Sequence, residues 1–492
     1  MAHYDLREYL EKLGAAGELH RIDTEVDPHL EAGAIAQRLA ERGGPAVHFA
    51  KVKGAGHGIS LVGGAMGRGV AGLWSRAAVA LDLDPLTEYR TLVEDIVRRC
   101  ETPVRPIQVG GGHCKDVKLG AAEVDLDSFA APFLHEGDGG RYLGSWGFIV
   151  VKEPRTDHVI WEILPLMVTS KSTMSGKFRR DSEAGRIYRE LYEKNGQPMP
   201  FALVLGAVPA ATLAASFRRR RGRVTAPELA GSLQREPMQL VRCETGDLLV
   251  PATAEMVIEG VVAPNARTES GPFAGTFGYR LPDRRMTPVF EVTAVTHRRF
   301  PIVPFCTWGT PTTDIQIAQG LDADAQLKAA FEKTGAPVSD VFTPPWLAGS
   351  VVAVTTRVPY TAYAQAVAGV VRITEATKYA PYILVCDNDI EITSPVALFH
   401  AMVTKCHPQR DTWIIKNAAA SEDAPYLTTE ERELGIGGRA IFDCTWPLDW
   451  DRSIAVPPKV SFDQCYPKAI QEKVLAEWTT ALGFPKETDR PV

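Results

Sequence analysis

The sequence has no CxxC pair among its eight cysteines, which argues against a zinc ribbon, a dithiol motif or a disulfide framework. No apolar stretch approaches the length that a membrane-spanning helix needs. The first residues are charged and amphipathic and lack an apolar signal core. The net charge of −6 gives no general attraction for nucleic acid or for an anionic membrane. We therefore expect a cytoplasmic protein with reduced cysteines that binds neither membrane nor nucleic acid.

The composition is that of an ordinary globular protein, and 492 residues are enough for two to four domains. Apolar residues at helical spacing predict helices over residues 5–15, where Asp5 is a plausible cap, and over 27–42. A strand is predicted at 46–52, so the chain starts as an α/β domain. A passage rich in proline and glycine at 102–112 marks a boundary and gives a first domain of residues 1–115.

The middle of the chain, residues 116–315, has short strand patterns separated by turns. One helix is predicted at 182–195, and the strands are predicted at 147–151, 159–163, 201–205, 256–262 and 289–295. This pattern indicates a β-rich domain, which we interpret as a barrel.

The last region, residues 316–492, alternates buried strands with helices, as in a doubly wound α/β domain. Its predicted strands and helices are at 351–354, 382–385 and 413–415, and at 360–377 and 396–404. An amphipathic tail helix is predicted at 463–482, and we expect it to dock on a neighbouring subunit.

A charged, glycine-rich loop, LHEGDGGRYLGSW at residues 134–146, directly precedes a predicted strand. It combines the carboxylates Glu136 and Asp138 with Gly139 and Gly140. Such loops often carry chemistry in α/β enzymes, although a plain surface turn explains the same composition.

Several specific blocks give the chain a resemblance that covers nearly its whole length. They are DLREYLEKLGAAGELHRID, HEGDGGRYLG, GQPMPFALVLGAVPAATLAAS, REPMQLVRCETGDLLVPATAEMVIEG, SGPFAGTFGYR, AMVTKCHPQRD and AIFDCTWP. In these blocks the chain resembles the UbiD family, decarboxylases of unsaturated and aromatic carboxylic acids that use prenylated FMN. The resemblance implies an N-terminal α/β domain, a central split β-barrel that binds the flavin, and a C-terminal α/β oligomerisation domain. It also implies a homodimer or homohexamer and a flavin prenyltransferase that supplies the cofactor.

The resemblance also implies a site from which this chain departs. The family holds a glutamate over the flavin, tuned by an arginine and a second acid; here the arginine position falls on Pro165, and the two acid positions fall on Ser270 and Gly275. The family binds the flavin phosphate through manganese, with a potassium ion nearby. The ligand positions fall on Ile160, on Glu183 or Ala184, and on Gln239, so both ions are expected to be weakly held if they bind.

The pocket-forming blocks are retained. By resemblance, the cofactor-binding candidates are Ile160, Trp161, Ile163, Pro165, Glu183, Ala214, Ser216, Phe217 and Gln239. Ser216 and carbonyls near Ala214 and Phe217 are candidates to hold the potassium ion. Gln239, through its amide oxygen, and Glu183 are the candidate ligands of a divalent metal. For Glu183 the alternative is an acid that favours the start of a helix.

The proton donor is less clear from the sequence. Glu269, one residue from an acid position of the family, and Ser270, which could orient a water molecule, are the catalytic candidates, although solvent exposure is favoured for Glu269. Glu162 is expected to face away from Trp161 on the same strand. His135 and Cys306 are further candidates, but a lone histidine or cysteine is more often structural.

A basic run, FRRRRGR at 217–223, follows Ser216, and a neighbouring block contributes Lys171, Lys177, Arg179 and Arg180. Such a cluster is usually a solvated surface, but it also suits phosphate groups such as those of a coenzyme A thioester. Three hypotheses result: a divergent decarboxylase or carboxylase acting on an aromatic, heteroaromatic or α,β-unsaturated acid or its thioester; a relative with a changed reaction or flavin; and a non-catalytic partner subunit.

Overall fold

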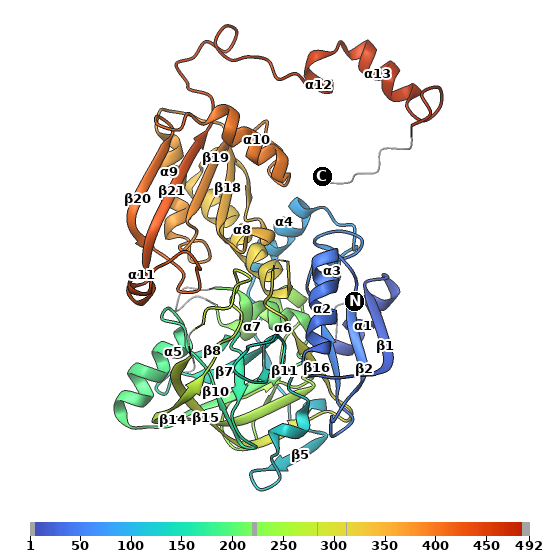
Figure 1. Ribbon diagram of the computed structural model, residues 1–492, viewed down its shortest axis with the longest axis vertical. Helices are drawn as coiled ribbons and strands as arrows, with labels where there is room; N and C mark the ends of the chain where they lie inside the picture. Colours follow the sequence, from blue (N-terminus) through green and yellow to red (C-terminus); the bar gives the residue numbers. More distant parts are fainter. Residues whose placement is uncertain (1–4, 157, 219–223, 283, 311, 485–492) are drawn as a thin grey trace.

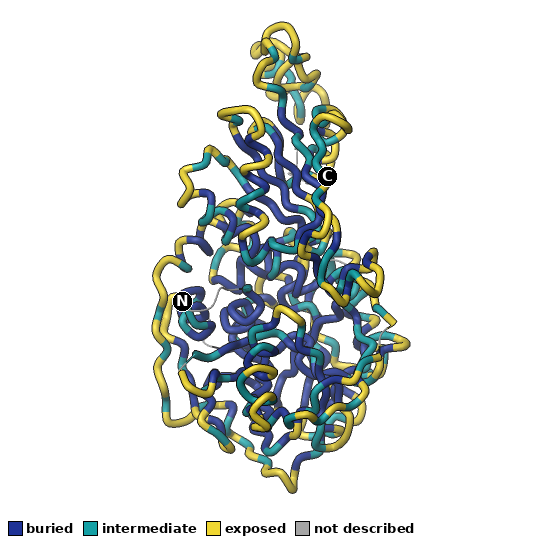
Figure 2. Tube along the Cα trace, turned by 90° about the vertical axis from the view of Figure 1, so that its left-hand side faces the viewer, coloured by how far each residue is buried: buried dark blue, intermediate teal, exposed yellow. Residues whose placement is uncertain are grey.

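The computed structural model describes residues 5–156, 158–218, 224–282, 284–310 and 312–484. Its N-terminal and central units lie side by side in the lower body, and the C-terminal unit stands above them (Figure 1). Buried chain fills the middle of the lower body and the sheet of the upper unit (Figure 2). The expected α/β, multi-domain fold is confirmed. Within the described ranges, no helix combines the length and apolar character needed to cross a bilayer.

The N-terminal unit is a four-stranded sheet with helices packed on it, in the strand order β1-β2-β3-β16. Its elements are α1 (Leu6–Ala15), β1 (Leu19–Val26), α2 (Glu31–Arg42), β2 (Ala46–Val52), β3 (Ser60–Gly63), α3 (Ser75–Ala80) and α4 (Tyr89–Cys100). Helix α1 begins where the Asp5 side chain accepts a hydrogen bond from the Glu8 backbone at 2.9 Å, as the capping pattern predicts. The fourth strand, β16 (Ile302–Phe305), pairs in parallel with β3. The chain therefore returns to complete the first sheet after it has built the central domain.

The central unit is built on a nine-stranded sheet. Its order is β6-β9-β10-β15-β14-β11-β7-β8, with β5 paired to β15. Its strands are β5 (Val117–Gly120), β6 (Tyr142–Leu143), β7 (Gly147–Lys152), β8 (Val159–Glu162), β9 (Leu166–Val168), β10 (Thr173–Ser175), β11 (Met199–Leu205), β14 (Met256–Ser270) and β15 (Arg285–His297). The end strands β6 and β8 do not pair with each other in the described residues, so the sheet is open rather than a closed barrel.

Smaller elements surround this sheet. They are the short sheet of β4 (Ile107–Gln108), β12 (Gln239–Arg242) and β13 (Leu249–Pro251), the single turns η1 (His113–Lys115) and η2 (Leu126–Phe129), and the helices α6 (Pro209–Ser216) and α7 (Ala226–Gln234). The helix predicted at 182–195 forms as three consecutive pieces, α5 (Glu183–Arg186), the π-helical η3 (Ile187–Tyr192) and the 3₁₀ turn η4 (Glu193–Asn195). One core cluster includes side chains from α4, α6 and α7, from the strands β7 and β8, and from the long helix α8 (Asp314–Thr334).

The C-terminal unit is a five-stranded sheet of order β17-β18-β19-β21-β20, whose three central strands are parallel. Its elements are β17 (Val338–Phe342), η5 (Pro345–Leu347), β18 (Val351–Thr356), α9 (Tyr363–Ile373), β19 (Tyr382–Asp387), α10 (Pro395–Lys405), β20 (Thr412–Ala419), α11 (Thr429–Leu434) and β21 (Ile436–Cys444). The predicted alternation of strands and helices is present in this part of the chain.

The tail leaves the body after β21 and carries α12 (Phe462–Cys465) and α13 (Lys468–Glu477) (Figure 1). The prediction of one continuous helix over 463–482 is wrong. Pro467 lies between the two helices, and it disfavours the helical conformation for Tyr466, which is extended. Neither helix buries a residue against this chain.

Candidate active site

The floor of the candidate site is β8, an edge strand that pairs only with β7 among the described strands. The Trp161 indole is 4% exposed and stacks on Phe148, with ring centroids 4.8 Å apart. Its Nε1 is buried and has no hydrogen-bond partner in the described part of the chain. An unsatisfied buried donor on a cavity wall is a natural partner for a ligand acceptor.

The opposite wall is α6, whose last turn has only small side chains. Pro209 occupies a first-turn position of this helix, and Ala214, Ala215 and Ser216 are buried at its end. The Ser216 hydroxyl donates to the Leu213 carbonyl at 2.8 Å. Small residues here leave the space between α6 and β8 open.

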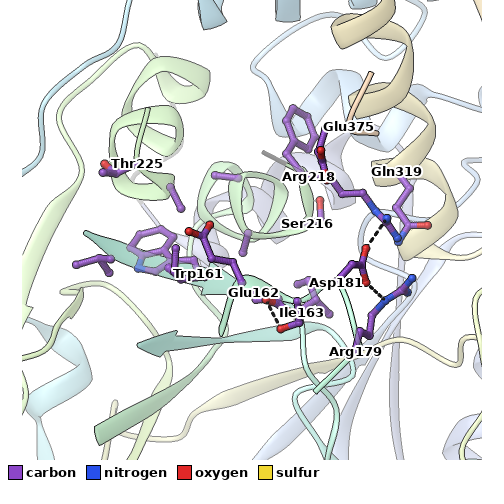
Figure 3. A pocket seen from close by; sticks show the side chains of 18 of the residues that line it. Trp161, Glu162, Ile163, Arg179, Asp181, Ser216, Arg218, Thr225, Gln319 and Glu375 are labelled. Carbon is purple, nitrogen blue, oxygen red and sulfur yellow. Dashed lines mark hydrogen bonds and ion pairs between the residues drawn. The ribbon is translucent and has the colours of Figure 1, made fainter. Parts of the chain in front are cut away.

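These walls enclose a cavity of about 160 Å³. It is lined from four directions: by β8 with Arg179 and residues 181–183, by the end of α6 with residues 224–226, by Trp308 with Ile315 and Gln319, and by Glu375. Figure 3 shows an apolar side at Trp161 and Ile163 and a charged side at Arg179, Asp181 and Arg218. A cavity with apolar walls and a few convergent polar groups is the usual form of a ligand site.

The charged side is an arginine–aspartate–arginine group. The Asp181 carboxylate lies 3.4 Å from Arg179 Nε and 3.2 Å from Arg218 Nη1 (Figure 3). Burial alone would raise the pKa of Asp181, but the two guanidinium charges outweigh it and lower that pKa. Arg179 also lies 3.3 Å from Asp423, and the carboxylates outweigh its burial and raise its pKa. Asp181 is therefore ionised at neutral pH and Arg179 is positive, whereas burial and the neighbouring Arg179 charge lower the pKa of Arg218.

Glu162 lies on the floor without a basic partner. Its Oε2 accepts from Ser182 Oγ at 2.9 Å and from the Ala184 backbone N–H at 3.4 Å. Burial raises the pKa of Glu162, and the Ser182 hydrogen bond only partly opposes this shift. As strand alternation predicts, Glu162 faces away from Trp161: the indole packs on Phe148, whereas the Glu162 carboxyl group bonds to Ser182 and Ala184 on the face that Ile160 shares. Both residues still line the cavity, because it lies along the edge of β8.

Glu183 has a different environment. Its Oε1 lies 3.1 Å from His158 Nε2 and 3.8 Å from Arg186 Nη2. Its neighbour Ser182 caps α5 by accepting from Gly185 N at 2.9 Å. Glu183 therefore belongs to an ion-paired group at the cavity rim and also begins a helix, as the alternative interpretation holds.

Seven sequence-predicted cofactor residues lie together on this cavity: Ile160, Trp161, Ile163, Glu183, Ala214, Ser216 and Phe217. Two others do not line it. Pro165 lies in the turn between β8 and β9, and Gln239 begins β12 in the separate three-stranded sheet.

The two predicted catalytic residues lie at the end of β14 and do not line the cavity either. The Glu269 side chain is 59% exposed, and its Oε2 lies 3.6 Å from Arg284 Nη1. Ser270 is buried beside Tyr142, which it hydrogen-bonds. The further candidates have local partners: His135 Nδ1 lies 3.0 Å from Asp138, and Cys306 is buried with its thiol donating to Thr313 Oγ1.

The cavity suits a flavin nucleotide in the kind of groups that it offers, namely an aromatic and apolar floor, an unpartnered indole N–H and a pair of arginines. A bridging divalent cation fits less well. The predicted ligands Gln239 and Glu183 do not line the cavity together, and the described residues contain no group of three His, Cys, Asp or Glu side chains arranged to hold a metal.

Comparison with known proteins agrees with this architecture. Three family models cover most of the chain: the 3-octaprenyl-4-hydroxybenzoate carboxy-lyase N-terminal domain at residues 10–96, the Rift-related domain at 106–311 and the C-terminal domain at 317–444. These models define a carboxy-lyase class of three-part chains. The chain belongs to the UbiD family.

Similar proteins match over nearly their full lengths. The pyrrole-2-carboxylic acid decarboxylase of Pseudomonas aeruginosa is 32% identical, with 98% of each chain covered. The ferulic acid decarboxylase 1 of Saccharomyces cerevisiae is 28% identical, with 96% of this chain and 97% of that protein covered.

Solved structures agree as well. The vanillic acid decarboxylase of Sedimentibacter hydroxybenzoicus, in its closed form, has a TM-score of 0.86 at 26% identity and covers 98% of this chain and 100% of its own. The UbiD-class enzyme HmfF of Pelotomaculum thermopropionicum, in complex with FMN, has a TM-score of 0.81 at 26% identity and covers 93% of this chain and 97% of its own.

Proposed function

We propose that this protein removes carbon dioxide, without net oxidation, from an aromatic, heteroaromatic or α,β-unsaturated carboxylic acid with the help of prenylated FMN. The observation that carries the proposal is the cavity between β8 and α6, which has an apolar aromatic floor at one side and paired arginines at the other. Three of the relatives named above support the reaction class, since their names are those of decarboxylases of pyrrole-2-carboxylic, ferulic and vanillic acid. A bound prenylated flavin supplies an electron sink for the carbon–carbon bond that breaks.

The chain's own side chains have two tasks in this proposal. The apolar wall of Trp161, Ile163 and Ile315 excludes water from the ring of the substrate and from the cofactor. Arg179 and Arg218 hold the negative ends of the ligands, because a guanidinium group pairs well with carboxylate and phosphate oxygens. No step requires a divalent metal or potassium ion, although Glu183 and the end of α6 remain the candidate places for them.

The free acid is favoured over a coenzyme A thioester. The basic run lies at residues 217–223, of which 219–223 are outside the described residues. Arg218 turns inward, where its guanidinium lies over the Tyr379 ring at 5.2 Å and pairs with Asp181. The described part of this run therefore serves the cavity rather than an outer phosphate site.

The test is expression with a flavin prenyltransferase, mass spectrometry of the bound cofactor, and carbon dioxide release from pyrrole-2-carboxylate, hydroxycinnamates and hydroxybenzoates. We expect bound prenylated flavin and release from at least one acid. If the protein binds the cofactor but releases carbon dioxide from none of the acids, the result supports a relative with a changed reaction. If the protein binds no flavin, the result supports a non-catalytic partner subunit.

A charge variant sharpens the test. Arg179→Gln is expected to raise KM about tenfold or more, the effect of losing one charge-assisted hydrogen bond. Lys177→Gln is the matched control, because Lys177 pairs with Glu422 at 2.9 Å and does not line the cavity. Equal KM values for the two variants would contradict substrate binding by Arg179.

We also propose that the protein works in a reducing compartment such as the cytoplasm, since all eight cysteines lie in described ranges and none of them forms a disulfide bond. A homodimer or homohexamer is proposed on the exposed tail, where Ile470 and Leu475 of α13 are 47% and 53% exposed. Light scattering of the full chain and of a chain ending at residue 445 tests this assembly, and an unchanged mass would contradict a role for the tail.

A further inference from the structure

Decarboxylation leaves an electron pair on carbon, and a proton must take the place of carbon dioxide. The donor must lie in the cavity and must hold a proton at working pH. Four carboxyl groups line the cavity among the described residues, namely Glu162, Asp181, Glu183 and Glu375. This inference rests on the proposed function, since it concerns the proton of that same reaction.

Three of the four are engaged by cations. Asp181 lies between Arg179 and Arg218. Glu183 lies within 4 Å of His158 and Arg186. Glu375 accepts a hydrogen bond from Lys378 Nζ. Each of these three carboxyl groups is therefore already engaged by a basic side chain.

Glu162 has only neutral partners. Both of its hydrogen bonds, from Ser182 Oγ and from the Ala184 N–H, reach Oε2, and Oε1 has no hydrogen-bond partner within the described part of the chain. The ion pairs found among the described residues do not include Glu162. The free oxygen can therefore carry a proton while the other oxygen fixes the orientation of the carboxyl group.

We propose that Glu162 is the catalytic proton donor of this protein. The bond between the substrate carbon and its carboxylate breaks, carbon dioxide leaves, and the electron pair of that bond stays on the substrate side. The Oε1 proton of Glu162 then moves to that carbon as the new C–H bond forms. Glu162 is left as a carboxylate, and a water molecule entering the cavity returns a proton from solvent, so that one substrate carboxylate and one proton give one decarboxylated product and carbon dioxide.

The surroundings support a neutral Glu162. Burial raises its pKa, and among the charged groups Arg179 opposes this shift while Asp181 adds to it. Helices α6 and α7 bring the uncharged lining residues Ala214, Ser216, Thr225 and Ala226, and Arg218 follows α6 in the same lining. Helix α5 brings Glu183, whose Oε1 lies 3.1 Å from His158 Nε2 and 3.8 Å from Arg186 Nη2.

Glu162→Gln tests the assignment, because the amide keeps the shape of the side chain and cannot donate as an acid. We expect product formation to fall about 100-fold or more, a typical effect of losing a general acid. FMN binding, measured by flavin fluorescence, should stay within twofold of the wild type and so report an intact site. Glu162→Asp should recover part of the rate, and Glu190→Gln on the exposed face of η3 is the control, expected at wild-type rate.

An infrared measurement gives a second readout that needs no turnover. The wild type at neutral pH should show the carbonyl stretch of a protonated carboxyl group that Glu162→Gln lacks. A spectrum without that difference overturns the assignment even if the variant is too unstable for kinetics. An active wild type with a fully active Glu162→Gln overturns it while the proposed function stands, and a flavin-loaded wild type that decarboxylates no acid overturns both.

Discussion

Two glutamates of the central domain, Glu255 and Glu162, have opposite surroundings. Glu255 is fully buried and directly precedes β14. Its carboxylate accepts hydrogen bonds from Arg7 Nε and Nη2 at 2.8 Å each and from the Ile302 N–H at 3.0 Å. It also lies 3.4 Å from Arg298 Nη1. Glu162 has only a hydroxyl and one backbone N–H. The first carboxylate joins α1 to the central domain, and the second is left free to hold a proton. The difference shows that the partners of a buried acid indicate its role better than its burial does. Arginine partners indicate a structural role, and neutral partners leave the acid able to take part in chemistry.

The largest effect is expected at Glu255. Glu255→Gln should lower the free energy of unfolding by about 3–5 kcal/mol, because it leaves the Arg7 and Arg298 charges without their shared carboxylate. The shift of the urea transition that unfolds the N-terminal unit measures this loss. Glu190→Gln, on an exposed helical face, is the control. If the free energy of unfolding falls by less than about 1 kcal/mol, Glu255 does not have the structural role that this comparison assigns to it.

Glu18 is a second buried carboxylate with a structural role, and its contribution to the stability of the fold should depend on pH. Burial alone would raise its pKa, but donors from Ala71, Ser75 and Val70 and the Arg76 charge outweigh it and lower the pKa below the ordinary value. At a pH between the pKa of Glu18 in the folded chain and its pKa in the unfolded chain, the unfolded chain binds more protons. The ionised Glu18 therefore stabilises the fold above its unfolded pKa, and this contribution is lost as the pH falls through its folded pKa. Glu18→Gln should cost about 2 kcal/mol at pH 7 and progressively less in acid. Thermal unfolding at several pH values measures the gap, and a gap that stays constant would contradict the lowered pKa.

Much of the fold follows from local patterns in the sequence. The predicted strand at 46–52 coincides with β2, and the Asp5 cap begins α1, because both depend on neighbours in the chain. The apolar pocket wall could also be predicted, since Trp161 and Ala214 lie in contiguous runs.

The charged half of the site could be predicted only in part. The sequence groups Arg179 and Arg218 in one basic cluster, but their pairing with Asp181 and the approach of Glu375 join separate segments that meet only in the folded chain. Strand alternation gave the correct face for Glu162, opposite Trp161, but it could not show that Ser182 and Ala184 lie against that face. The tail helix was predicted as one piece because its apolar pattern continues across Pro467.

Glu162 should show the opposite pH dependence from Glu18. The pKa of Glu162 is raised in the folded chain, so at a pH between its unfolded and folded pKa values the folded chain binds more protons. Glu162 therefore makes its full contribution to stability below its unfolded pKa, and this contribution is lost as the pH rises through its folded pKa. Glu162→Gln should therefore unfold like the wild type near pH 5 and become more stable than it, by about 1 kcal/mol, at alkaline pH. If the difference in stability between Glu162→Gln and the wild type does not change with pH over that range, Glu162 is ionised in the folded chain. It would then be a carboxylate like Glu255 and not a proton donor.

The smallest effect is expected at Glu269, the acid that the sequence offers as a catalytic candidate, although it favours solvent exposure for that side chain. Its side chain is mostly exposed and its contact with Arg284 is 3.6 Å long, so Glu269→Gln should change stability by less than about 0.5 kcal/mol and the decarboxylation rate by less than about twofold. Ser270→Ala is the matched test one residue along, since Ser270 is buried and bonded to Tyr142 and its sequence-based role is to orient water. A large loss of rate at Glu269, with flavin binding intact, would mean that the end of β14 moves into the cavity when ligands bind. The comparison of acids would then need Glu269 in place of Glu162.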